Sequence, residues 1–183
     1  MAQRSADELR HCFETSKNPN ELFDAFEEAI ALRIGEFQYY RSLFWNFALT
    51  ADELCLFADK LAKEFPALGY EVFIWLAHIF AIMRSSNDNF ELAMIYFQKS
   101  AAIQPDNLEP YLDAADCYNS DINIPPVKTL IDFLKSGIEH IAEPRALYER
   151  LAYLYEMCDN DEMRDYFRRK AGDENLPPSD TEE

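Results

Sequence analysis

The side chains that most often carry out chemistry in proteins stand far apart in this sequence. The four cysteines lie at positions 12, 55, 117 and 158, and the three histidines lie at positions 11, 78 and 140. No two cysteines form a CxxC pair, and no cysteine stands beside a histidine at the spacing of a metal site. These residues predict four small, buried, reduced thiols, a packed His78 and two isolated histidines, His11 and His140. They predict no metal site.

Carboxylates are abundant but are not arranged for catalysis. Pairs such as Glu27-Glu28 alternate between the faces of a helix, which is typical of solvated side chains. The segment that follows Cys158 has calcium-type ligands but lacks the glycine and the twelve-residue spacing of a calcium-binding loop. No nucleophile elbow, phosphate loop or zinc-protease motif occurs. The sequence therefore predicts a protein that is not an enzyme and holds no cofactor.

Charge excludes two further classes of partner. The chain has 34 Asp plus Glu against 17 Lys plus Arg, which gives a formal net charge of −17. An acidic chain is repelled by phosphate backbones and anionic lipid, so we expect neither nucleic acid nor membrane as a partner. Apolar residues make up 49% of the chain, too many for a disordered protein.

The N-terminal sequence has no apolar core of signal-peptide length. The longest apolar run, residues 72–83, is too short to span a bilayer and is interrupted by His78. Together with the predicted free thiols, these features predict a cytoplasmic protein.

The elements that must position any site are helices. Four glycines are too few for a fold built on tight hairpins. Ser5 with Glu8 and Thr50 with Glu53 have the spacing of capping boxes, Asn20 precedes an amphipathic run, and Gly35 can end it. We expect antiparallel helix hairpins and an acidic, disordered tail over residues 172–183. The ten expected helices span residues 6–15, 21–34, 36–48, 51–64, 70–84, 89–102, 107–119, 126–139, 144–157 and 160–171.

Four stretches of the chain resemble one another. Each stretch begins with a large residue. A medium residue follows three positions later, a small one four positions later and a second large one seven positions later, and all four lie on one helix face. The leading aromatics are 33, 38 and 37 residues apart. The stretches are Tyr40-x2-Leu43-Phe44-x2-Phe47, Phe73-x2-Leu76-Ala77-x2-Phe80, Tyr111-x2-Ala114-Ala115-x2-Tyr118 and Tyr148-x2-Leu151-Ala152-x2-Tyr155.

This pattern, followed by Ala93, Phe97 and Pro105, resembles the tetratricopeptide repeat (TPR) family. The resemblance implies a right-handed α-solenoid of antiparallel helix hairpins. It implies repeats at about residues 36–66, 70–105, 107–143 and 144–171, with residues 1–35 as a capping hairpin. Phe44 departs from the family, which has a small residue at that position.

In the family geometry, the first helix of each repeat lines a concave groove. The residues one, two and five after each leading aromatic then point into this groove, and some lie a turn further along. The resemblance implies these partner-binding residues: Arg41, Trp45, Ile74, Trp75, His78, Leu112, Asp113, Asp116, Asn119, Glu149, Arg150 and Tyr153.

We therefore expect a non-catalytic adaptor or scaffold that binds a partner polypeptide in this groove. Trp45 and Trp75 are the expected anchors, and the acidic members favour an apolar segment with basic flanks. Two alternatives stay open. One is a small acidic secretion-type or assembly-type chaperone for a hydrophobic client, and the other is a structural repeat protein that self-associates.

Overall fold

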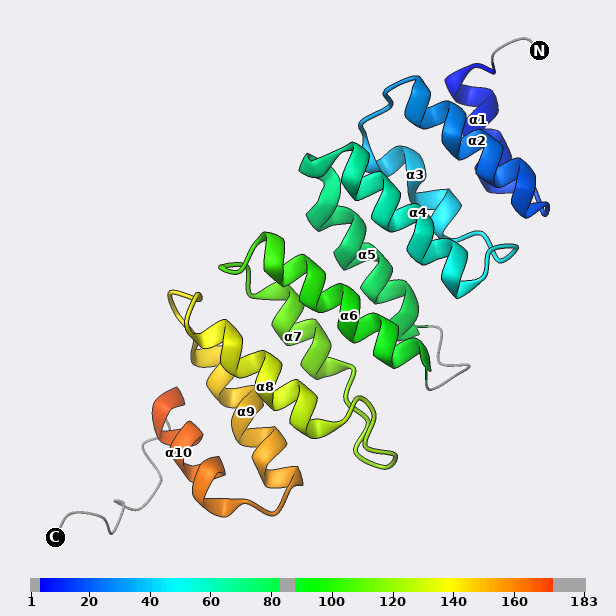
Figure 1. Ribbon diagram of the computed structural model, residues 1–183. Coiled ribbons are helices and arrows are strands. Elements are labelled where there is room, and N and C mark those ends of the chain that lie inside the picture. The colour runs from blue at the N-terminus through cyan, green and yellow to red at the C-terminus, as the bar shows by residue number, and fades with distance from the viewer. Residues whose placement is uncertain (1–3, 83–87, 173–183) are drawn as a thin grey trace, which may run out of the picture. The chain divides into compact units, whose positions relative to one another are not determined.

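In the computed structural model, the chain folds into α-helices joined by short loops (Figure 1). The structure describes residues 4–82 and 88–172. Within these ranges it contains ten α-helices and no β-strand, which confirms the all-α prediction. Of the predicted tail, only Gly172 belongs to the described residues; the rest lies outside them.

The chain divides into two compact units, Met1–Ile103 and Gln104–Glu183, which we call unit 1 and unit 2. The helices of unit 1 are α1 (Ala6–Thr15), α2 (Pro19–Ala31), α3 (Phe37–Phe44), α4 (Ala51–Glu64), α5 (Gly69–Ile82) and α6 (Asp88–Ile103), with a short 3-10 turn at Pro66–Leu68. The helices of unit 2 are α7 (Glu109–Asp116), α8 (Val127–Ile138), α9 (Arg145–Met157) and α10 (Asp161–Ala171).

Unit 1 is built of helix pairs in two layers (Figure 1). Helices α1, α3 and α5 pack side by side in one layer, and α2 packs beside α4 in the other. Helix α6 joins the second layer, where the Tyr96 hydroxyl donates to the carbonyl of Cys55 on α4 at 3.3 Å. In this arrangement the odd-numbered helices share one face of the unit.

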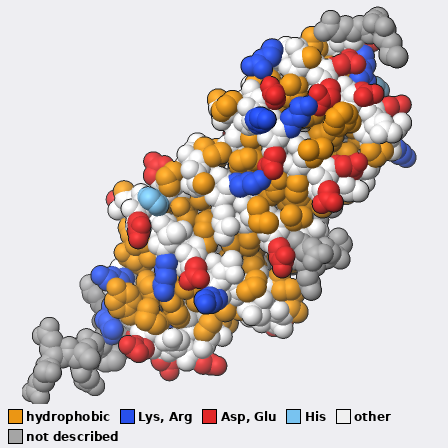
Figure 2. Space-filling view, in the orientation of Figure 1, with side chains coloured by type: hydrophobic (Ala, Val, Ile, Leu, Met, Phe, Trp, Pro, Cys, Tyr) orange, Lys and Arg blue, Asp and Glu red, His pale blue; other side chains and the backbone are white. Residues whose placement is uncertain are grey.

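The outer face of unit 1, formed by α2, α4 and α6, carries interleaved charges of both signs (Figure 2). Lys60 of α4 pairs with Glu27 of α2, and Lys99 of α6 pairs with Asp59 of α4 at 2.6 Å. Each ion pair joins two neighbouring helices, so these charged side chains link α2 to α4 and α4 to α6.

In unit 2, α8 packs against α7 and α9, and α10 packs along α9. Gly137 of α8 lies against the ring of Tyr111 on α7, where an added Cβ would come within 2.8 Å of a ring carbon. Tyr111 also packs against Phe133 of α8, with 4.8 Å between ring centroids. Glycine is thus required at position 137 for α7 and α8 to approach this closely.

Two helix starts follow the predicted capping boxes. The Ser5 amide donates to Glu8 Oε2 at 2.7 Å, and the Glu8 amide donates back to Ser5 Oγ at 3.3 Å. Thr50 and Glu53 repeat this reciprocal arrangement. The helices that begin there, at Ala6 and Ala51, have the predicted bounds at both ends.

The predicted caps of α2 were wrong at both ends. Asn18, not Asn20, caps its N-terminus: its side chain accepts the Asn20 amide at 3.1 Å, and Pro19 occupies the first helical position. The helix ends at Ala31, before Gly35, and Arg33 takes the positive φ of 57° in the turn.

Two further predicted helices also end early. Helix α3 ends at Phe44 instead of residue 48, and α7 ends at Asp116 instead of residue 119. Past α7, the Asn119 amide donates to the carbonyl of Ile124 at 2.8 Å, which draws the backbone into an isolated bridge and out of helical geometry. Helix α3 ends where the Asn46 side chain ties the loop that follows it to α1.

The small residues of the repeat pattern lie where close packing was expected. Ala77, Ala115 and Ala152 are all buried on their helices. Of the large residues that accompany them, Phe80 and Tyr111 are buried, and Phe73, Tyr118, Tyr148 and Tyr155 are half-buried. The spacing of large and small residues therefore identified the packed faces of α5, α7 and α9.

Among the described helices, none combines the length and the apolar character that crossing a bilayer requires.

Candidate functional site

The structure gathers several of the predicted partner-binding residues into two clusters, one in each unit. In unit 1, Arg41 and Trp45 each contact Trp75. In unit 2, Asp116, Arg150 and Tyr153 line one pocket. We call these the aromatic site and the ion-paired pocket, and each is built by residues of its own unit alone.

The aromatic site consists of a cation and two indole rings. Arg41 and Trp45 are one helical turn apart, at the end of α3, and Trp75 lies on the neighbouring α5. The Arg41 guanidinium carbon lies 3.8 Å from the centre of the Trp75 ring. The Trp45 and Trp75 rings meet edge to face, at 6.2 Å and 84°. Both contacts have favourable electrostatics, because a ring face is negative and a ring edge and a guanidinium are positive.

The aromatic site has one ring exposed to solvent and one hydrogen-bond donor without an acceptor. The Trp45 side chain is 39% exposed. The Trp75 indole nitrogen is buried, and no atom of the described residues accepts its hydrogen. A buried donor without an acceptor destabilises a protein by about 1–3 kcal/mol. Such unsatisfied donors are rare in native proteins, and one explanation is that a bound ligand supplies the acceptor.

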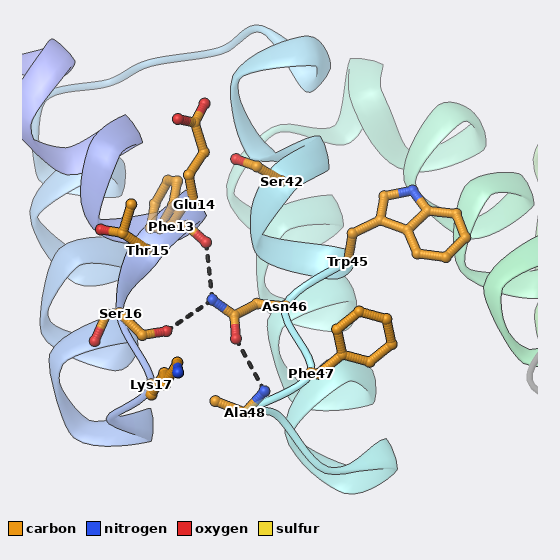
Figure 3. Close-up of a pocket in the computed structure, with 10 residues that line it drawn as sticks. All are labelled: Phe13, Glu14, Thr15, Ser16, Lys17, Ser42, Trp45, Asn46, Phe47 and Ala48. Atoms are coloured by element: carbon orange, nitrogen blue, oxygen red, sulfur yellow. Dashed lines mark hydrogen bonds between the residues drawn. The ribbon is translucent and has the colours of Figure 1, made fainter.

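A pocket of about 590 Å³ opens beside Trp45, between the ends of α1 and α3 (Figure 3). We call it the α1–α3 pocket. Its lining residues are Phe13, Glu14, Thr15, Ser16, Lys17, Ser42, Trp45, Asn46, Phe47 and Ala48.

Asn46 builds one wall of the α1–α3 pocket with three hydrogen bonds (Figure 3). Its side-chain nitrogen donates to the carbonyls of Phe13, at 2.9 Å, and Ser16, at 3.0 Å. Its side-chain oxygen accepts the Ala48 amide at 2.9 Å. Asn46 thereby satisfies carbonyls at the end of α1 that have no helical partner, and it folds its own backbone into a turn. This turn ends α3 at Phe44.

Phe47 is the residue that sequence reasoning misplaced. The repeat pattern put it on the packed face of its helix, but it lies in the turn after α3 and is 89% exposed. The signal that could have located it is Asn46, since an asparagine that bonds to nearby backbone competes with helix formation. Figure 3 shows the Phe47 ring on the same side of the loop as Trp45.

The other two predicted residues of unit 1 are packed. Ile74 is buried at 8% exposure, so its side chain is not offered to a partner. His78 is half-buried, and its ring lies 5.7 Å from that of Phe97 on α6. The His78–Phe97 contact joins α5 to α6.

The ion-paired pocket of unit 2 is smaller and more polar. It has a volume of about 280 Å³ and is lined by Ala115, Asp116, Tyr118, Arg150, Tyr153 and Leu154. The Arg150 guanidinium contacts the Asp116 carboxylate at 2.9 Å, and Tyr153 is 49% exposed at its edge. Burial, with smaller contributions from Cys158 and Tyr153, raises the pKa of Tyr118, so its phenol is a neutral donor at physiological pH.

The carboxylates expected to attract a basic partner are largely paired within unit 2. Asp116 contacts Arg150, Glu149 contacts Arg145 at 3.0 Å, and Glu156 contacts Arg168 at 3.0 Å. This pairing revises the expected acidic cluster, because an internal cation already neutralises each of these charges.

The remaining predicted residues of unit 2 are spread around the pocket. Leu112 and Asp113 are half-buried on α7. Asn119 is exposed, and its side-chain oxygen accepts the Asp121 amide at 3.1 Å. None of these three lines the ion-paired pocket.

Within residues 4–82 and 88–172, no group of three or more His, Cys, Asp and Glu side chains is placed to hold a metal ion. The predicted burial of the four cysteines was wrong: Cys12, Cys55 and Cys117 are half-buried, and Cys158 is exposed.

Comparison of the chain with protein-family models, curated proteins and solved structures gives no match in any of the three. The likeness to tetratricopeptide repeats therefore depends on the residue pattern alone.

Proposed function

We propose that this chain is a non-catalytic adaptor of the TPR-like, α-solenoid type, and that it binds a partner polypeptide at the aromatic site of unit 1. The layered helix pairs of unit 1 and the buried alanines of the repeat pattern support this type of fold. The function is carried by one observation: two indole rings and a stacked guanidinium lie at the surface beside a pocket of about 590 Å³.

The aromatic site consists of the residue types that contribute most of the binding energy in protein–protein interfaces. Trp, Tyr and Arg are the residues most enriched among those that cost at least about 2 kcal/mol of binding energy when truncated. The volume of the adjoining pocket lies within the range of about 300–1,000 Å³ that is typical of ligand pockets. The partner group that fits here is an apolar side chain.

The unpaired donor of Trp75 defines a second feature of the partner. Its indole nitrogen is buried under its neighbours, so a partner reaches it only if Trp45 or Arg41 turns aside. A backbone carbonyl of an extended segment would then accept this hydrogen. Binding would replace an unsatisfied donor with a hydrogen bond, so the exchange favours the bound state.

The charge requirement of the partner is weaker than the sequence predicts. The acids of unit 2 are ion-paired, so basic flanks would gain little from direct contact with them. The net charge of −17 still attracts a basic segment from a distance. Charge is therefore expected to govern the association rate, while the aromatic site governs the dissociation rate.

A random-peptide library displayed on phage and selected on the immobilised full-length chain tests the proposal. Enriched peptides are then measured by calorimetry against the wild type, Trp45→Ala and Ile95→Ala. Ile95 is the matched control, since it is an exposed apolar residue of unit 1 outside the pocket. We expect binding to be lost with Trp45→Ala and kept with Ile95→Ala.

Two outcomes would contradict the proposal. One is that no peptide family is enriched over selection on an unrelated acidic helical protein. The other is that the enriched peptides bind Trp45→Ala as tightly as the wild type.

A further inference from the structure

We propose that two copies of this chain associate through the α1–α3 pocket, with Phe47 of each copy inserted into the pocket of the other. This inference goes beyond the proposed function and does not depend on it. Three observations support it: an exposed aromatic ring, a pocket lined by the loop that carries this ring, and the charged residues at the rim of the pocket.

Phe47 is a protruding side chain on a hydrogen-bonded turn. It is 89% exposed, more than any other large apolar residue among those the structure describes. The turn that presents it is fixed by the hydrogen bonds of Asn46 to Phe13, Ser16 and Ala48. Because the loop is already ordered, inserting Phe47 into a partner sacrifices little backbone freedom.

The α1–α3 pocket provides the complementary cavity. It holds about 590 Å³ and has the buried ring of Phe13 and the Trp45 indole among its lining residues. Figure 3 shows Asn46 between the α1 residues on one side and the Phe47 ring on the other. The protruding ring and the cavity are therefore adjacent parts of one surface.

A protrusion next to its own complementary cavity favours a second copy over an unrelated partner. When two identical surfaces meet about a two-fold axis, each ring faces the other copy's cavity and both insertions form together. The interface closes on itself, so the product is a dimer and not a filament.

The charges on the rim are self-complementary in the same way. Glu14 and Lys17 both line the α1–α3 pocket, and neither makes an ion pair within residues 4–82 and 88–172. Two such rims that meet about a two-fold axis place Glu14 of each copy against Lys17 of the other. This arrangement satisfies both charges without help from a different protein.

The net charge of each chain opposes association. Two copies with a formal charge of −17 repel each other, and one loop with one pocket is a small interface. We therefore expect a reversible dimer that forms at micromolar or higher concentration and not an obligate one. Moderate salt should strengthen it by screening the net repulsion, until the Glu14–Lys17 contacts are screened as well.

Sedimentation analysis over a wide concentration range tests the dimer directly. The wild type should shift from a mass of 21.3 kDa toward twice that mass as its concentration rises. Phe47→Ala should stay monomeric, with at least about tenfold weaker association, while Ile95→Ala should behave like the wild type. Because Phe47 is exposed, its replacement leaves the fold intact, and circular dichroism verifies this. A wild type that stays monomeric up to millimolar concentration overturns the proposal, as does a Phe47→Ala variant that dimerises normally.

A charge exchange separates this interface from every other mode of self-association. Glu14→Lys and Lys17→Glu should each weaken homodimerisation by at least about tenfold, since like charges then meet across the axis. Mixing the two variants should restore association, because the acidic rim of Lys17→Glu faces the basic rim of Glu14→Lys. Failure of the mixture to associate, or normal homodimers of both variants, would show that the rims do not meet. Because the proposed peptide would use the same pocket, its affinity is measured at a chain concentration below that at which the wild type dimerises.

Discussion

The two predicted binding regions of this chain are built in opposite ways. In unit 1, the aromatic site exposes Trp45, leaves the Trp75 indole hydrogen without an acceptor and adjoins a large pocket. In unit 2, the ion-paired pocket is small, and its two charged residues neutralise each other. The sequence pattern assigned both regions to the same role, but the structure gives them different capacities to bind.

This difference shows what a binding region requires beyond suitable residue types. Asp116 and Arg150 have the chemistry of a recognition site, but any partner must first compete with their own ion pair. At the aromatic site, a partner that displaces Trp45 or Arg41 would also gain a hydrogen bond from a donor that is now unpaired. Unsatisfied groups and exposed aromatic surface are therefore the reason that we propose unit 1, and not unit 2, as the binding unit.

The largest expected effect concerns affinity. Trp45→Ala should lower the affinity for a library-selected peptide by at least about 30-fold, or about 2 kcal/mol, because it removes an aromatic anchor. The matched change in unit 2, Tyr153→Ala, should lower it by less than about fivefold. Calorimetry with both variants measures the contrast. Equal losses would show that the two units share the partner.

The next effect concerns the loop that presents the aromatic site. Asn46→Ala removes three hydrogen bonds and leaves carbonyls of α1 unpaired, so it should destabilise unit 1 by about 1–3 kcal/mol. Asn160→Ala removes only the N-cap of α10 in unit 2 and should cost about 1 kcal/mol.

Urea unfolding followed by tryptophan fluorescence checks this prediction, since both tryptophans lie in unit 1. The fluorescence transition should move more with Asn46→Ala than with Asn160→Ala. A reversed order would mean that the Asn46 hydrogen bonds do not hold the loop.

A smaller effect is expected in the ion-paired pocket. Asp116 and Arg150 are both more than 40% exposed, so their contact is screened by solvent. Replacing both residues with Ala should change stability by less than about 1 kcal/mol and should leave peptide affinity nearly unchanged. Thermal melts at low and high salt provide the measurement. A large or strongly salt-dependent loss would restore unit 2 as a charged binding site.

The smallest effect at neutral pH involves two buried phenols of unit 1. Burial raises the pKa of Tyr40 and the pKa of Tyr96 far above that of a free tyrosine. Each neutral phenol therefore contributes its full stability below about pH 10 and loses it progressively as the pH rises above that value. Tyr96→Phe should extend the alkaline limit of unfolding upward, as monitored by tryptophan fluorescence. An unchanged alkaline limit would mean that another group controls it.

Sequence signals that involve only neighbouring residues predicted the fold well, and those that depend on distant contacts did not. Capping boxes are local, and the helices that start at Ala6 and Ala51 have their predicted bounds. The alanines of the repeat pattern also marked packed faces, because a small residue beside large ones has one packing role. The pattern failed at Phe47, where an asparagine that reaches across to α1 outweighs helical periodicity.

The sites were less predictable than the helices. Proximity of Trp45 to Trp75 follows from the spacing of neighbouring repeats, and the structure brings these rings together. The pairing of Asp116 with Arg150 depends on side-chain orientation between two helices, which no single helix pattern specifies. The free donor of Trp75 likewise depends on what surrounds it and not on its own position in the sequence.

The most direct test of the central claim uses the two tryptophans as probes. Both tryptophans of the chain belong to the aromatic site, so intrinsic emission reports on that site alone. A library-selected peptide should shift the emission to shorter wavelength in a saturable way, with the same midpoint in the wild type and in an Asp116→Ala, Arg150→Ala variant. A peptide that binds the wild type by calorimetry without changing the emission would contradict the claim that unit 1 holds the partner.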